Sequence, residues 1–124
     1  MYCVMGGQKM AVIDLHEGNG CSQDLLASVT YKKGRRINFK KSKTIENDEA
    51  RSCSLHDLPV GAVVRFFDNP KGKKDDDWCE ITVKKSHQQY CVGSFERTYE
   101  DDFVRVTYHK DNGLDGKVSR MEMD

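Results

Sequence analysis

The apolar residues of this chain recur at every second position in short segments, and no segment keeps the spacing of an amphipathic helix. The alternation is clearest in residues 36–40, 78–83 and 103–109, where polar side chains alternate with aromatic or β-branched ones. Residues such as Gly, Pro, Asn and Asp separate these segments, as in DNPKG at residues 68–72. About nine short strands joined by turns predict an all-β fold, an antiparallel β-sandwich.

Length and composition favour a single domain over residues 1–124, because the chain is long enough for one core and too short for two typical domains. Its 20 basic and 20 acidic residues cancel, so whole-molecule charge favours neither nucleic acid nor an anionic membrane as partner. No apolar run approaches the roughly 20 residues that span a bilayer. We expect an unknown protein or cell-surface target as partner, and nucleic acid is the least expected one.

The five cysteines exceed what a cytosolic domain of this size needs: Cys3, Cys21, Cys53, Cys79 and Cys91. Two disulfides with one free thiol, or five buried thiols, both agree with their spacing. The first residues lack the basic start and apolar stretch of a secretory signal. An extracellular or periplasmic location therefore requires that a signal has been removed.

Two segments share the pattern of a polar turn that runs into a short strand: residues 47–55 (NDEARSCSL) and residues 115–123 (DGKVSRMEM). The first resembles the closing segment of a βγ-crystallin Greek-key motif, and the second resembles a further copy of it. Residues 66–72 (FFDNPKG) are similar to that family's aromatic-to-glycine hairpin corner. The resemblance implies two Greek keys, at about 9–59 and 60–124, with an insertion between Lys84 and Asp102.

The same resemblance implies calcium sites, because the closing segments of this family supply the oxygen ligands that calcium prefers. The candidate ligands in this chain are Asn47, Asp48, Asp115 and Ser119. Arg51 stands at the fifth position of the first segment, where the family usually has Ser or Thr, and its guanidinium argues against calcium in that copy. Gly116 replaces an expected Asn or Asp in the second segment.

A basic stretch from Tyr31 to Lys43 is the main rival functional feature. It holds seven cations and no acid: Lys32, Lys33, Arg35, Arg36, Lys40, Lys41 and Lys43. Such a hairpin can bind a phosphate backbone and, through Tyr31 and Phe39, stack on bases. Strand alternation, however, places both aromatic side chains on the face that would be buried. The acidic clusters at residues 75–77 and 100–102 indicate loops, with residues 73–77 expected to be solvated.

No catalytic motif stands out, since the four histidines are scattered and the only Cys-to-His pair with short spacing, Cys53 and His56, lacks a second pair for zinc. We therefore expect no enzymatic activity. The resemblance implies a non-enzymatic βγ-crystallin-like structural or binding module with a possible link to calcium. The alternatives are a small secreted toxin or proteinase-inhibitor-like protein that uses loops on a β-sandwich, and polyanion or nucleic-acid binding through the basic hairpin 31–43.

Overall fold

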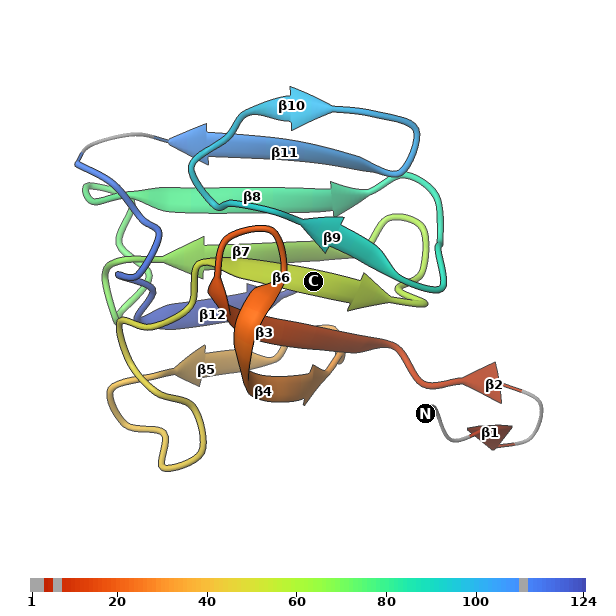
Figure 1. The fold of residues 1–124 in the computed structure, drawn as a ribbon, viewed down its shortest axis with the longest axis horizontal. Helices are drawn as coiled ribbons and strands as arrows, with labels where there is room; N and C mark the ends of the chain where they lie inside the picture. The colour runs from red at the N-terminus through yellow and green to blue at the C-terminus, as the bar shows by residue number, and fades with distance from the viewer. Residues whose placement is uncertain (1–3, 6–7, 110–111) are drawn as a thin grey trace.

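The structure is a computed structural model that describes residues 4–5, 8–109 and 112–124, and all regular structure in these residues is β-strand (Figure 1). The prediction of an all-β chain is therefore confirmed. The strands β1 (Val4–Met5) and β2 (Gln8–Lys9) pair only with each other. The remaining strands form two larger sheets in which every pairing is antiparallel.

The smaller of these sheets has four strands in the order β4-β3-β6-β9. Its strands are β3 (Val12–Gly18), β4 (Ser22–Thr30), β6 (Ser52–His56) and β9 (Tyr90–Val92). The larger sheet has six strands in the order β10-β11-β8-β7-β12-β5. Its strands are β5 (Arg36–Asn38), β7 (Val63–Phe67), β8 (Trp78–Val83), β10 (Tyr99–Glu100), β11 (Val104–His109) and β12 (Arg120–Met123).

Each sheet takes one strand from the other half of the chain. The strand β9 pairs with β6 of the four-stranded sheet, and β5 pairs with β12 of the six-stranded sheet. The strands β10 and β11 extend the larger sheet beyond β8 (Figure 1). The range between Lys84 and Asp102, where an insertion was predicted, contains β9 and β10, and β11 follows it. Because of this exchange, neither half of the chain completes its own sheet.

A single hydrophobic cluster lies between the two sheets. It is built from the side chains that face inward at every second position of the strands. Ile13 and Leu15 of β3 are fully buried, as are Val64 and Phe66 of β7. The ring of Phe66 stacks on that of Phe95 with centroids 4.3 Å apart. Burial of one such side chain contributes roughly 1.5–3 kcal/mol, so this shared core holds the sheets together.

The pairing of β3 with β4 shifts register at Leu15/His16 and His16/Gly18, so β3 carries bulges before it ends at Gly18. One local prediction differs from the structure. The prediction of a solvated loop at residues 73–77 is wrong for Asp77, which is fully buried. Its carboxylate accepts hydrogen bonds from the Tyr108 hydroxyl and from the backbone N–H groups of residues 112 and 113.

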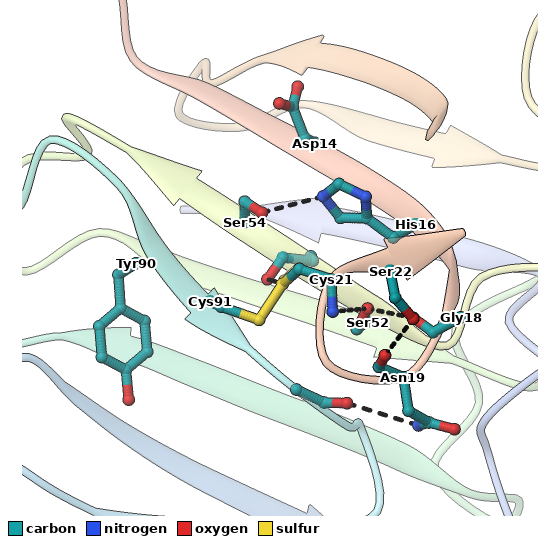
Figure 2. The surroundings of a disulfide bond; sticks show 12 residues. Asp14, His16, Gly18, Asn19, Cys21, Ser22, Ser52, Ser54, Tyr90 and Cys91 are labelled. Carbon is teal, nitrogen blue, oxygen red and sulfur yellow. Dashed lines mark hydrogen bonds between the residues drawn. A yellow bond between two sulfur atoms is a disulfide. The ribbon is translucent and has the colours of Figure 1, made fainter. Parts of the chain in front are cut away.

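One disulfide joins Cys21, in the turn after β3, to Cys91 of β9, which comes from the second half of the chain (Figure 2). Cys53 and Cys79 are buried free thiols. The alternative with two disulfides is therefore not realised among the described cysteines, and Cys3 lies outside the described residues. The disulfide ties the two halves together at the exchanged strand.

Candidate functional site

The two polar turns that precede β6 and β12 lie side by side, although they come from opposite halves of the chain. We call residues 47–51 the first closing turn and residues 115–119 the second closing turn. The N–H of Asp48 donates to the carbonyl of Val118 at 3.1 Å, and the N–H of Gly116 donates to the carbonyl of Ala50 at 2.9 Å. The second residue of each turn therefore bonds the fourth residue of the other, which is a reciprocal arrangement.

The backbone conformation at the second position is the same in both closing turns. Asp48 has φ of 62° and Gly116 has φ of 79°, and both values lie in the left-handed region that Gly adopts freely and Asp tolerates. The sequence difference at this position thus leaves the turn geometry unchanged. It changes the chemistry, because only the first closing turn carries a carboxylate there.

The fifth residue of each closing turn reaches the other turn. The hydroxyl of Ser119 donates to Oδ1 of Asp48 at 3.2 Å. The guanidinium of Arg51 lies against Gly116, where a Cβ atom would stand 3.0 Å from Nη2. The guanidinium of Arg51 thus lies against the second closing turn, and the first closing turn receives a serine hydroxyl; the effect of Arg51 on calcium stays a prediction.

The first closing turn gathers oxygen atoms of the kind that bind hard cations. Oδ1 of Asn47 is buried and has no hydrogen-bond partner among the described residues. The pKa of Asp68 is raised by burial and then by the nearby charge of Asp76; the charge of Lys117 lowers it, and those of Asp48 and Asp77 raise it further. Acidic groups and one lysine thus share the surroundings of this turn. In the described part of the chain, however, no three or more His, Cys, Asp or Glu side chains lie close enough to hold a metal ion by themselves.

The second closing turn uses its acid for structure. Oδ2 of Asp115 accepts hydrogen bonds from Asn19 Nδ2 at 2.7 Å and from Ser94 Oγ at 2.6 Å, while Oδ1 accepts from the N–H of Phe95 at 2.8 Å. Both oxygens are therefore engaged by donors. The four candidate calcium ligands separate into Asn47, Asp48 and Ser119 on one side and Asp115 on the other.

The basic stretch lies around β5. Of its seven cations, Arg36 is the one with an ion pair among the described residues, to Glu122 at 3.6 Å and to Asp124 at 3.0 Å. The guanidinium of Arg35 donates to the carbonyl of Thr30. The other five side chains are exposed: Lys32, Lys33, Lys40, Lys41 and Lys43.

The two aromatic residues of the basic stretch point away from any ligand that would lie on it. Phe39 is only 1% exposed. Tyr31 is half-buried and its hydroxyl donates to the backbone carbonyl of Asp124 at 2.7 Å. These two rings are therefore not available to stack on nucleic-acid bases. Binding of a polyanion to this stretch would depend on its charges.

The outer face of the four-stranded sheet carries a polar cluster that the sequence analysis did not predict (Figure 2). Nε2 of His16 lies 2.9 Å from Ser54 Oγ, as Figure 2 shows. Nε2 of His56 lies 3.0 Å from Oδ2 of Asp14. The signal that could have found it is the pair of i, i+2 spacings, because residues 14 and 16 share one face of β3 and residues 54 and 56 share one face of β6. Ser54 is only 1% exposed, so this cluster offers no accessible nucleophile.

No family model, curated protein or solved structure matches this chain. Within the described residues, no helix is long and apolar enough to cross a membrane.

Proposed function

We propose that this chain is a non-catalytic βγ-crystallin-like structural and binding module whose stability is linked to calcium through the first closing turn. The observation that carries the proposal is the reciprocal bonding of the two closing turns, in which Asp48 and Gly116 each donate to the partner turn. Such reciprocity is what two repeated motifs related by a local two-fold axis would produce.

The order of strands supports the assignment to two Greek keys. The first half supplies β3, β4 and β6 to one sheet and sends β5 to the other. The second half supplies β7, β8 and β12 to the larger sheet and sends β9 to the smaller one. In both halves the third of the four strands crosses to the opposite sheet, with β10 and β11 as an addition to the second half.

Several contacts support a role without catalysis. Burial raises the pKa of the Cys53 thiol well above its ordinary value and also raises that of Cys79, so both thiols are poor nucleophiles. Ser54 pairs with His16, whereas Asp14 pairs with the other histidine, His56. The polar cluster on the four-stranded sheet thus divides its serine and its carboxylate between two different histidines.

The calcium link rests on the donor set of the first closing turn. Asn47, Asp48 and Ser119 would hold the ion together with backbone carbonyls, all of them oxygen ligands of the type that calcium takes. Bound calcium would supply charge neutralisation beside Asp48 and Asp68. With so few carboxylates we expect an affinity of the extracellular class, with Kd on the order of 10⁻⁴–10⁻³ M.

The disulfide and the absence of a membrane-crossing helix in the described residues are compatible with an extracellular location. We therefore propose an extracellular or periplasmic site of action. The alternative of a toxin or proteinase inhibitor stays a prediction. Polyanion binding is the second candidate function, because the lysines at residues 32, 33, 40, 41 and 43 have no ion pair in the described part of the chain.

Thermal melting with calcium or magnesium, together with calorimetric titration, tests the main proposal. We expect millimolar calcium to raise Tm, because a ligand that binds only the folded state stabilises it. Asp48→Asn keeps a residue that tolerates the left-handed backbone and should lose most of the rise. Asp102→Asn, at an exposed carboxylate near β11, should keep the full rise. An unchanged wild-type Tm at millimolar calcium would refute the calcium link.

A further inference from the structure

The outer edge of β4 is open. This strand has nine residues and pairs with β3 along one edge, and no other strand of the described residues pairs with its second edge. An open edge presents backbone N–H and C=O groups that can accept a further strand. The recognition chemistry of such an edge is that of a polypeptide backbone.

Two adjoining hollows of about 560 Å³ and 310 Å³ run along β4. The first is lined by residues 24–26 of β4 together with Glu17 and residues 39–47, apart from Lys41, which connect β5 to β6. The second is lined by residues 27–30 and Arg35. Thr44 and Ile45 line both hollows, so they form one continuous trough, which we call the β4 groove.

Apolar side chains line the middle of the β4 groove. Leu25 is 54% exposed and projects from the strand at this point. Leu26 lies beside it and is partly buried, while Phe39 and Ile45 belong to the core below. The groove thus offers an apolar surface beside an edge that has no partner strand in the described residues, with the carbonyl of Thr30 already bonded by Arg35.

The charges of the β4 groove differ between its two ends. At the end near Asp24 the lining contains three acids and two lysines: Glu17, Asp24, Glu46, Lys40 and Lys43. At the end near Thr30, Arg35 is the one charged residue of the lining. None of these six charged side chains forms an ion pair within the described residues. The groove is therefore negative by one charge at one end and positive at the other.

We infer that the β4 groove binds an extended segment of a partner protein, added as a strand antiparallel to β4. Antiparallel pairing is the more stable arrangement per residue, and it places the start of the segment beside Arg35 and its end beside Asp24 and Glu17. Charge complementarity then selects a segment with an acidic residue near its start and a basic residue near its end. The apolar side chain of Leu25 and the strand conformation favour β-branched residues between them. The inference deepens the proposed binding role and does not depend on calcium.

The shape of β4 favours a short segment over a second copy of the chain. Gln23 has φ of 60°, and the β3–β4 ladder carries two register shifts. Bulges and kinks of this kind twist an edge and limit long, flat pairing between identical strands. A flexible segment can follow the kink, while residues 39–47 form the opposite wall.

Fluorescence polarisation with two labelled synthetic heptapeptides tests the inference. The first has the sequence Glu-Thr-Val-Thr-Val-Thr-Lys and the second exchanges its terminal Glu and Lys. We expect the first peptide to bind at least tenfold more tightly, and the same affinity in calcium and in EDTA. An N-methylated version of the first peptide, which cannot donate backbone hydrogen bonds on one edge, should lose binding.

Matched variants connect the binding to the β4 groove. Leu25→Lys should weaken binding of the first peptide at least tenfold, whereas Val60→Lys, at an apolar residue that is 68% exposed outside the groove, should leave it unchanged. Arg35→Glu should reverse the preference between the two peptides. Equal binding of both peptides, no binding of either, or insensitivity to Leu25→Lys would overturn the inference. A dimer in light scattering that Leu25→Lys dissociates would also overturn it, in favour of a second copy.

These outcomes separate the inference from the proposed function. If calcium leaves Tm unchanged while the first peptide binds as expected, the calcium link fails and the β4 groove stands. If calcium raises Tm and the variants of the groove have no effect on peptide binding, the groove fails and the calcium-linked module stands.

Discussion

Ser119 donates a hydrogen bond to Asp48 across the two halves of the chain, although 71 positions separate them in sequence. The contact makes the first closing turn a composite of both halves. Any cation held there would depend on the folded arrangement of the whole chain, and removal of either side chain should have the same consequence.

Ser119→Ala tests this composite turn. Loss of a hydrogen bond to a charged acceptor should lower the free energy of unfolding by about 1.5–3 kcal/mol at most, and the calcium-dependent rise in Tm should shrink. Urea denaturation with and without calcium measures both effects. Ser42→Ala, at a half-buried serine in the loop after β5, is the control, and it should leave the calcium effect intact. A full calcium response in Ser119→Ala would contradict the composite turn.

Arg51→Ser tests whether the guanidinium excludes a cation from the second closing turn. Removing the positive charge beside Gly116 and supplying a hydroxyl should increase the heat of calcium binding and the Tm shift. Arg51→Gln removes the charge but supplies no hydroxyl, so it should give a smaller increase in the heat of calcium binding and in the Tm shift. Calorimetric titration of both variants measures the stoichiometry, and two titrations identical to wild type would refute the role given to Arg51.

The disulfide should contribute strongly to stability, because it closes a long loop between Cys21 and Cys91, which are 70 positions apart. Loop-closure entropy predicts a loss of about 4 kcal/mol on its removal. Urea denaturation of the Cys21→Ser, Cys91→Ser double variant measures the loss. Reductant should destabilise the wild type and have no further effect on the double variant, and equal effects on both proteins would argue against this bond.

Acid should weaken the ion pairs of Glu100. Hydrogen bonds from Lys84 and Arg105 lower the pKa of its carboxyl from 4.5 to about 2. Between these two pH values the unfolded chain binds more protons than the folded one, so this contribution to stability is present above about pH 4.5 and is lost as the pH falls towards 2. Urea midpoints measured through this window should depend less on pH in Lys84→Gln. Lys85→Gln, at the neighbouring exposed lysine, should retain the wild-type slope.

Polyanion binding, the second candidate function, predicts retention on heparin that falls steeply with salt. Replacing Lys40, Lys41 and Lys43 by Gln should shift elution to lower salt. The matched control replaces Lys71, Lys73 and Lys74, which removes the same charge from the loop between β7 and β8. If both triple variants elute together, net charge rather than the basic stretch is responsible.

Sequence reasoning reached the strands because alternation of period two is a local property, visible in β8 and β11 without knowledge of neighbours. It could not assign β5 and β9 to the opposite sheets, since alternation indicates which side chains share a face and not which strand lies alongside. Asp77 was misjudged for a related reason: its burial depends on donors more than 30 positions away. The contact of Arg51 with Gly116 could not be predicted either, because the reciprocal contact between the closing turns is a tertiary property.

The exchange of β5 and β9 also constrains how the chain is made. A nascent chain that has emerged only as far as β8 lacks β9, the strand that completes the four-stranded sheet. The edge of β6 stays without its partner strand until residues 90–92 have emerged. Contacts of such long sequence separation slow folding. Native pairing of Cys21 with Cys91 can therefore occur only after the 70 residues that follow Cys21 have left the ribosome, so an earlier oxidation of Cys21 would have to use a different partner.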